Sequence, residues 1–145
     1  MRTSIFLANV LFFQTAFSQS WQPVSTGVVG GNFGFACVRA MTVYNNKLIV
    51  GGEFDNAGGN PAKNIAAWDG TNWSALGTEL KCNICGIGYT KCGQSEGYGR
   101  YGWVGALAVY NNELYAGGQF KDANGVSLNC IAKWNGSSWV GWGWC

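Results

Sequence analysis

The chain has 145 residues, enough for a single domain, and it carries a formal net charge of +2. Charged residues make up 11% of it, against about 25% in typical soluble domains, while glycine occurs 23 times, tryptophan eight times and histidine never. This composition excludes a disordered tail, a basic surface for nucleic acid, and any nucleophile pair or metal site that depends on histidine.

The N-terminus has the layout of a secretory signal peptide. Arg2 supplies a positive start, Ile5–Phe13 is a short apolar run, and small residues follow at Ala16 and Ser18. A membrane-spanning helix needs about 20 apolar residues, so this run is too short for one. We therefore expect cleavage after Ser18 and a secreted or cell-surface product. An uncleaved anchor or a buried N-terminal helix is the alternative.

Two segments of the chain are copies of one repeat. Residues 40–77 align without a gap with residues 106–143, at an offset of 66, and 17 of the 38 positions are identical. AMTVYNNKLIVGGEF in the first copy matches ALAVYNNELYAGGQF in the second, and NIAAWDGTNWSALG matches CIAKWNGSSWVGWG. Such a repeat sets the architecture, because each unit must bury its faces against its neighbours.

Each copy predicts four short antiparallel strands and no helix. In the first copy the strands cover residues 40–44, 47–51, 64–68 and 73–76. An Asn-Asn turn, a glycine-rich loop and an Asp-Gly turn separate them. Asp69 and the equivalent Asn135 suit the last of these turns, and we interpret both as structural. Four antiparallel strands per repeat are typical of a β-propeller blade, so an all-β fold is predicted.

The recurring glycines and tryptophans resemble the kelch motif, in which a strand ends in Gly-Gly and two spaced aromatic residues follow. The matching positions are Gly51, Gly52, Trp68 and Trp73 in the first copy and Gly117, Gly118, Trp134 and Trp139 in the second. The sequence pattern is more similar still to a kelch-like variety found in large secreted bacterial repeat proteins. Its motifs here are GG-x-F, I-A-x-W-[DN]-G and W-x-x-x-G. Fungal cell-surface polarity markers carry a similar pattern. The resemblance implies a propeller of the kelch and galactose-oxidase superfamily that is used for binding, and we interpret the recurrent tryptophans as packing between blades.

A third trace of the repeat precedes the first copy. Residues 21–27 (WQPVSTG) resemble the fourth strand, and an N-terminal strand of this kind often closes a propeller ring like a clasp. Two blades cannot complete a ring of four to eight, so we expect part of a longer propeller or an assembly of several copies, and self-association of the isolated chain. The predicted organisation is a signal peptide 1–18 and a partial propeller 19–145, comprising clasp-like strand 21–27, blade 40–77, connection 78–105 and blade 106–143.

Six cysteines accompany the predicted secretion: Cys37, Cys82, Cys85, Cys92, Cys130 and Cys145. An even number in an exported chain favours disulfides, with a metal knuckle at Cys82, Cys85 and Cys92 or unpaired thiols as alternatives. If the strands form a meander, all six cysteines fall at one end of them. We predict that at least one bridge joins the connection between the blades to Cys37 or Cys130.

The same end carries the long connection between the blades, which has 14 residues more than the stretch preceding the first blade. Long loops on a rigid scaffold commonly bind partners, although stapling of a glycine-rich insert is an equal alternative. Trp142 and Trp144 are candidates for an aromatic binding surface or for packing against a further blade. Glu53 and Asp55 form a candidate carboxylate pair, for which a solvated loop is the simpler interpretation.

These features predict a non-catalytic binding or structural module, secreted or at the cell surface, that recognises a protein or a glycan through its loops. No catalytic residue, cofactor or metal ligand is assigned, and we expect neither nucleic-acid binding nor a membrane span after signal removal. The alternative is a fragment of a galactose-oxidase-like propeller enzyme. The copper site of that family needs histidines and tyrosines, so the catalytic residues would lie outside this chain.

Overall fold

The computed structural model describes residues 22–31, 34–78, 80, 102–120, 122–123, 126–127 and 130–141. In these ranges the regular structure consists of β-strands joined in antiparallel sheets, and there is no α-helix. The predicted all-β class is therefore confirmed for the described part of the chain. Within it there is also no helix long and apolar enough to cross a membrane.

Each copy of the repeat forms a four-stranded antiparallel meander. Sheet 1 has the order β2-β3-β6-β7 and consists of β2 (Cys37–Tyr44), β3 (Lys47–Glu53), β6 (Ile65–Trp68) and β7 (Trp73–Ala75). Sheet 2 has the order β13-β12-β9-β8 and consists of β8 (Trp103–Tyr110), β9 (Glu113–Gln119), β12 (Ile131–Trp134) and β13 (Trp139–Gly141). The four predicted strands per copy are confirmed, and the first strand of each begins three residues earlier than expected, at Cys37 and Trp103.

The hairpin turns follow from the asparagine pairs in the sequence. Asn45 and Asn46 have φ angles of 48° and 58°, and Asn111 and Asn112 have φ angles of 48° and 59°. The type I′ two-residue turn needs positive φ at both central positions, and asparagine tolerates this better than other non-glycine residues. Both sheets thus begin with the same tight hairpin.

The loop predicted between the second and third strands contains a short hairpin in each copy. In the first copy β4 (Asn56–Ala57) pairs with β5 (Asn60–Pro61), and β1 (Val28–Val29) joins them as a third strand. In the second copy β10 (Asp122–Ala123) pairs with β11 (Val126–Ser127). Gly58 and Gly59, with φ angles of 59° and 81°, make the first of these reversals.

The predicted N-terminal strand over residues 21–27 is not observed in the described part, residues 22–27. Ser25 and Gly27 have positive φ angles of 57° and 66°, and the Gly27 amide donates to the Val24 carbonyl oxygen at 3.1 Å. Residues 25–27 therefore leave the extended conformation, and Pro23 has no amide hydrogen to give to a ladder. The adjacent β1 forms instead and pairs with β4.

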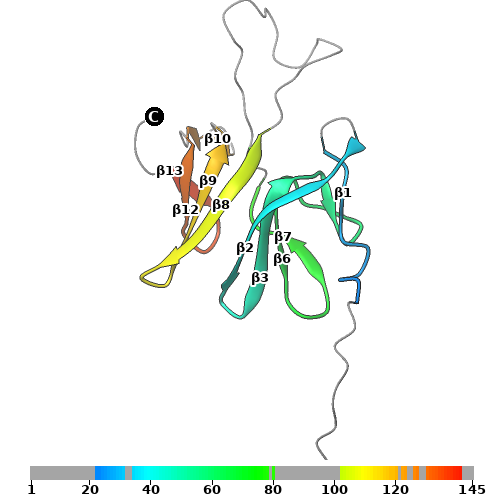
Figure 1. The fold of residues 1–145 in the computed structure, drawn as a ribbon. Coiled ribbons are helices and arrows are strands. Elements are labelled where there is room, and N and C mark those ends of the chain that lie inside the picture. The colour runs from blue at the N-terminus through cyan, green and yellow to red at the C-terminus, as the bar shows by residue number, and fades with distance from the viewer. Residues whose placement is uncertain are drawn as a thin grey trace, which may run out of the picture.

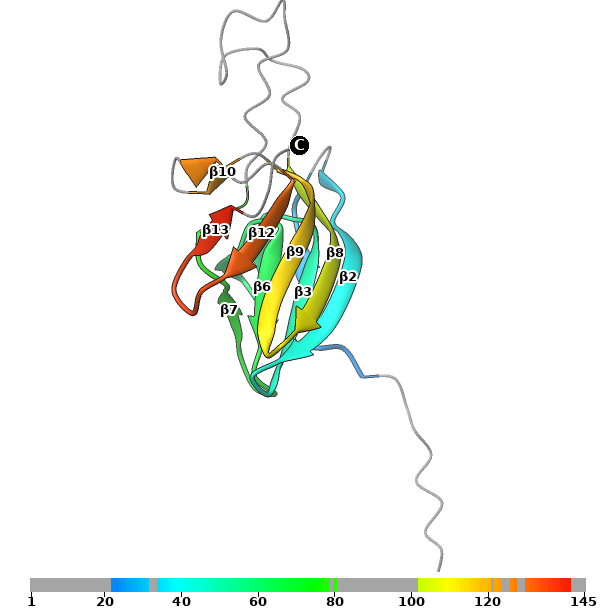
Figure 2. The same ribbon diagram turned by 90° about the vertical axis from the view of Figure 1, so that its left-hand side faces the viewer.

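The two four-stranded sheets pack face to face (Figures 1 and 2), and Figure 2 views sheet 2 with sheet 1 behind it. Their shared core contains residues of both sheets together with Leu80 and Phe120 from outside the strands; the sheet residues are Ile49, Ile65, Ala67, Val104, Leu114, Ala116, Ala132 and Trp139. A second core lies on the other face of sheet 1, where Val28 and the β4–β5 hairpin cover Phe54 and Trp73. The described residues form no closed ring of sheets.

The sheets stack head to tail, so that opposite faces of the repeat meet. Sheet 1 contributes Ile49 and Ile65 to the shared core, whereas sheet 2 contributes Ala116 and Ala132. Ala116 and Ala132 are equivalent, at the offset of 66, to Val50 and Ala66, which lie in the second core. Successive residues of a strand point to opposite faces. Sheet 1 therefore contacts sheet 2 through one face of the repeat unit, and sheet 2 contacts sheet 1 through the other face.

Candidate binding site at the seam between the sheets

Both sheets contain a β-bulge at the equivalent place. The register of β2 against β3 shifts between Val38 and Ala40, and that of β8 against β9 shifts between Val104 and Ala106. Arg39 is therefore the extra residue of the first bulge and Gly105 that of the second. A bulge bends its strand and redirects side chains, and bulges are common beside functional sites.

The second glycine of each Gly-Gly pair permits the bulge. A Cβ atom added to Gly52 would overlap the carbonyl oxygen of Cys37, and one added to Gly118 would overlap that of Trp103. Backbone atoms cannot move aside as a flexible side chain can, so only glycine fits opposite the bulge. The motif residue that the sequence singles out thus has a local structural role in both copies.

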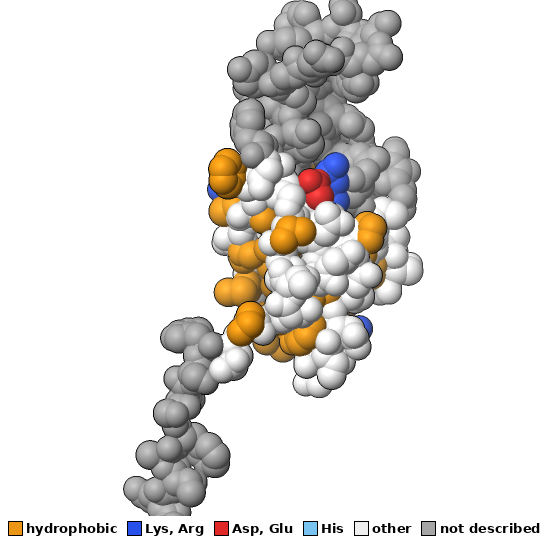
Figure 3. Space-filling model, turned by 90° about the vertical axis from the view of Figure 1, so that its right-hand side faces the viewer, with side chains coloured by type: hydrophobic (Ala, Val, Ile, Leu, Met, Phe, Trp, Pro, Cys, Tyr) orange, Lys and Arg blue, Asp and Glu red, His pale blue; other side chains and the backbone are white. Residues whose placement is uncertain are grey.

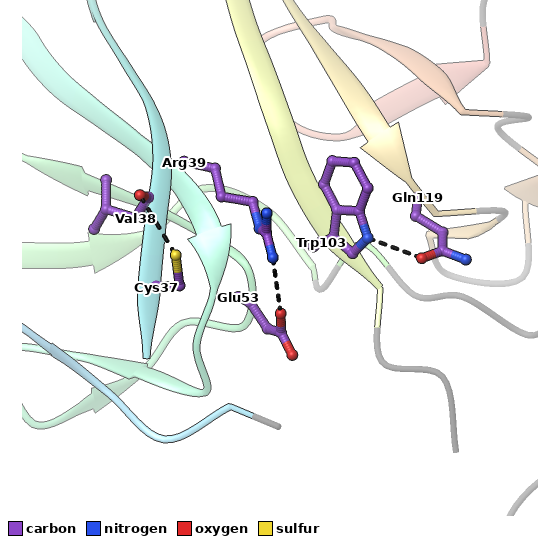
Figure 4. Close-up of polar contacts among 6 residues, drawn as sticks. All are labelled: Cys37, Val38, Arg39, Glu53, Trp103 and Gln119. Carbon is purple, nitrogen blue, oxygen red and sulfur yellow. Dashed lines mark hydrogen bonds and ion pairs between the residues drawn. The ribbon is translucent and has the colours of Figure 1, made fainter. Parts of the chain in front are cut away.

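The bulge of sheet 1 places Arg39 against sheet 2. Its guanidinium carbon lies 4.9 Å from the centroid of the Trp103 ring, and its Nη2 lies 3.4 Å from Oε2 of Glu53 (Figure 4). Trp103 Nε1 donates a hydrogen bond to Oε1 of Gln119 at 2.8 Å. We call these four residues the seam cluster, because β2 and β8 lie side by side here. A cation over an aromatic face contributes about 0.5–1 kcal/mol when exposed.

The seam cluster consists of positions at which the two copies differ. Arg39 corresponds to Gly105, and Glu53 corresponds to Gln119. Trp103 corresponds to Cys37. A Cβ atom added to Gly105 would overlap the six-membered ring of Trp103. The small residue in the second bulge therefore leaves room for the indole, and the large residue in the first bulge reaches across to it.

The seam cluster can present an exposed cation and an aromatic surface to a ligand. The Arg39 side chain is exposed, so the guanidinium N–H groups that do not donate to Glu53 are accessible to a ligand. A guanidinium binds carboxylate or sulfate groups in a bidentate manner, and an indole packs against the apolar side of a sugar or a side chain. Sequence reasoning singled out Glu53 but missed Arg39 and Trp103, because the aligned segments began at residue 40. A position-by-position comparison extended to Cys37 and Trp103 would have exposed the divergence.

Two of the six predicted disulfide cysteines lie in the described part of the chain. Cys37 begins β2 and pairs with Glu53, and the Cys130 carbonyl oxygen accepts from Gly118 at 3.0 Å. Both therefore lie at the end where the second strand of each sheet finishes, which confirms the predicted placement for these two residues. Both are free thiols in the structure, so it holds no bridge from either of them to the connection between the sheets.

The remaining candidates fall outside the described residues. They are Cys82, Cys85, Cys92, Cys145, Trp142 and Trp144, together with the signal peptide and most of the connection 78–105. Among the described residues, no three His, Cys, Asp or Glu side chains lie close enough together to hold a metal ion.

Of the recurrent tryptophans, Trp134 and Trp139 lie in the core between the sheets, whereas Trp68 and Trp73 lie in the second core on the other face of sheet 1. The ring centroids of Trp68 and Trp73 are 5.4 Å apart, and those of Trp134 and Trp139 are 5.3 Å apart. Trp139 Nε1 donates to the carbonyl oxygen of Leu76 at 2.9 Å, which ties sheet 2 to the end of sheet 1.

Glu53 and Asp55, the candidate carboxylate pair, have separate partners. Glu53 pairs with Arg39, whereas Asp55 accepts from the Gly31 amide at 2.8 Å and lies 3.7 Å from Nζ of Lys63. The two carboxylates are thus each balanced by their own cation, as a structural role requires.

A second polar cluster lies at the opposite end of sheet 2. The Tyr115 hydroxyl donates to Oε2 of Glu113 at 2.6 Å, and Lys133 Nζ lies 2.9 Å from Oε1. The hydrogen bond from Tyr115, followed by that from Lys133, lowers the pKa of Glu113, and the same bond raises the pKa of Tyr115. We call these three residues the outer triad; their equivalents in the first copy are Lys47, Ile49 and Ala67.

No protein-family model, curated protein or solved structure matches the chain with statistical significance.

Proposed function

We propose that the chain is a non-catalytic binding module, secreted or held at the cell surface, that recognises a protein or a glycan at the loop end of its sheets. The observation that carries this proposal is the seam cluster. Arg39 and Trp103 occupy divergent positions of an otherwise repeated framework, yet the stacking of the sheets brings them into contact. Positions that differ between the copies but lie in contact in the fold are expected of a recognition site on a structural repeat.

We also propose that the two sheets are blades of a kelch-like β-propeller. The head-to-tail stacking supports this, because identical units related by one repeated operation build a ring or a solenoid. The Gly-Gly pairs support it as well, since Gly52 and Gly118 have the same role in their two sheets. In this proposal the loop end of the sheets is one face of the propeller.

The test is binding by protein recovered from the medium of a host that expresses the full chain, which also tests secretion. The probe is an array of neutral, carboxylate-bearing and sulfated glycans, with an array of extracellular proteins beside it. We expect Arg39→Ala to lose most of the binding to whichever probe is retained, because it removes the exposed cation.

The matched control is Lys47→Ala, which removes a cation from the same sheet at the opposite end, beside the Asn45-Asn46 turn. It should bind as the unmodified chain does. Equal binding by both variants, or equal loss in both, would show that recognition does not occur at the seam cluster.

A further inference from the structure

The contact between the two sheets is made by a projecting pair and a receiving pair of residues. Val104 and Leu107 project from β8 of sheet 2 over Gly51 of sheet 1, and the receiving pair is Gly51 with Ile65, its direct partner across β3 and β6 in the same core. A Cβ atom added to Gly51 would lie 2.5 Å from Cγ1 of Val104 and 3.3 Å from Cδ1 of Leu107. Val104 is 0% exposed and Ile65 is 2% exposed, so this contact is closely packed.

The chain contains equivalents of both the projecting pair and the receiving pair. No other sheet among the described residues packs against these equivalents. Val38 and Met41 are the equivalents of the projecting pair, and they are 42% and 63% exposed on β2. Hydrophobic side chains gather along one margin of the side of the molecule away from sheet 2 (Figure 3). This exposure contrasts with the complete burial of Val104.

The equivalents of the receiving pair are Gly117 and Ile131, which are paired across β9 and β12. Ile131 is 45% exposed, although its equivalent Ile65 is buried. A Cβ atom added to Gly117 would meet Cβ of Ala106 at 3.7 Å, an ordinary contact. Packing within the described residues therefore does not require glycine here, whereas a neighbouring sheet would.

The N-terminal segment shows that sheet 1 is arranged as if another unit preceded it. Trp73 Nε1 donates to the carbonyl oxygen of Val24 at 3.2 Å, just as Trp139 donates to Leu76. Val24 and Leu76 are equivalent at an offset of 52, and the next residues, Ser25 and Gly77, both have positive φ angles, 57° and 76°. Residues 24–25 thus reproduce the end of a preceding unit, while the sheet of that unit is not supplied by the described residues.

We infer that the chain binds a second copy of itself head to tail. Val38 and Met41 of one copy pack over Gly117 and Ile131 of the next, as Val104 and Leu107 pack over Gly51 and Ile65 within each copy. The two surfaces differ, so the contact is heterologous, and repetition gives a ring if the rotation closes and an open polymer if it does not. This inference concerns the faces of the sheets and does not depend on what the seam cluster binds.

The outer triad is compatible with a covered position. It lies on the same face of sheet 2 as Ile131, toward the hairpin end, and both carboxylate oxygens of Glu113 already have partners in Tyr115 and Lys133. Covering a charge that is already paired and hydrogen-bonded costs far less than covering an isolated one. The tyrosine ring and the lysine stem offer apolar area to the second copy.

The test combines one variant on each surface, with sedimentation velocity as the measurement from ~1 to ~100 μM. Unmodified chain should form a ring of two or more copies, or polymers, in a concentration-dependent manner. Val38→Asp and Ile131→Asp each place a charge in one half of the contact, so each variant alone should be monomeric. Both positions are exposed within the copy, so the melting temperature of the dilute protein should not change.

An equimolar mixture of the two variants separates this proposal from other modes of association. Val38→Asp keeps an intact receiving surface and Ile131→Asp keeps an intact projecting surface, so the mixture should form a one-to-one dimer that grows no further. Phe35→Asp, which removes another exposed apolar side chain, should assemble like the unmodified chain. A monomeric unmodified chain, assembly by either single variant, or a mixture that stays monomeric would overturn the proposal.

Discussion

Asp69 and Asn135 accept equivalent hydrogen bonds in equivalent turns, but only Asp69 titrates. Oδ1 of Asp69 accepts from the amides of Asn72 at 2.7 Å and Thr71 at 2.8 Å, and also from the Thr71 hydroxyl. These bonds, led by that from Asn72, lower the pKa of Asp69 from 3.8 to about 2. Oδ1 of Asn135 accepts from the amides of Ser137 and Ser138. The structural role predicted for both residues agrees with these contacts.

The first prediction is a pH dependence of stability that belongs to Asp69 alone. Its pKa is lower in the folded state, so its contribution is full above pH 3.8 and is lost as the pH falls toward about 2. Asp69→Asn should flatten this part of the curve of unfolding free energy against pH, and Asn135→Asp should add a similar acid-sensitive contribution. Denaturant titrations at several pH values measure both, and unchanged slopes in both variants would contradict the assignment.

The second prediction concerns the backbone at Cys130, whose φ angle is 69°. Its equivalent Asn64 has a φ angle of 66°, and its side-chain amide donates to the Leu80 carbonyl oxygen at 2.9 Å. A left-handed conformation costs roughly 1–2 kcal/mol for most residues and less for asparagine, so Cys130→Asn should stabilise the fold by about 1 kcal/mol. The reciprocal Asn64→Cys should destabilise it by more, because it also removes the bond to Leu80. Thermal melts of the two variants test the difference in sign.

Each bulge combines three elements of the repeat: an extra residue in the first strand, a glycine opposite it, and a change of register. The bulge explains why Arg39 leaves the regular alternation of β2 and reaches Trp103 on the neighbouring sheet. It also explains why the motif ends in two glycines rather than one, because Gly52 accommodates the bulge while Gly51 accommodates the neighbouring sheet.

The third prediction compares two adjacent glycines of β9. Gly118→Ala should destabilise the fold by about 2 kcal/mol or more, because the added methyl group overlaps the carbonyl oxygen of Trp103 and the bulge must rearrange. Gly117→Ala should have little effect in dilute protein, since its methyl group makes an ordinary contact with Ala106. Chemical denaturation of the two variants checks this, and similar losses in both would argue against the bulge as the cause.

At the scale of the molecule, stability depends on how closely sheet 2 approaches sheet 1. The fourth prediction is that Gly51→Ala costs about 1–3 kcal/mol by overpacking against the stiff, buried side chain of Val104. Val104→Ala removes the obstructing methyl groups, so the double variant should be more stable than the sum of the two single losses implies. A double-mutant cycle measures this coupling, and strict additivity would contradict the contact.

The sequence by itself determined the four strands of each main sheet, their order and the two-residue and Asp-Gly or Asn-Gly turns that join them, but not the short hairpins in the loops. Alternating side chains, the Asn45-Asn46 pair and the glycine pairs act through the dihedral preferences of neighbouring residues, so they can be interpreted locally. The same local reasoning placed Cys37 and Cys130 at one end of the strands, because a meander fixes which connections share an end.

Only the tertiary structure decided which residues of the two copies meet. Arg39 contacts Trp103, and Val104 fills the space above Gly51, whereas no side chain of another sheet approaches Gly117 among the described residues. These differences arise because the sheets stack in one particular register and orientation. That register results from many packing contacts between residues distant in the chain, and no local pattern specifies it. The position of residues 24 and 25 has the same origin, because the bond from Trp73 Nε1 to the Val24 carbonyl oxygen is itself a long-range contact.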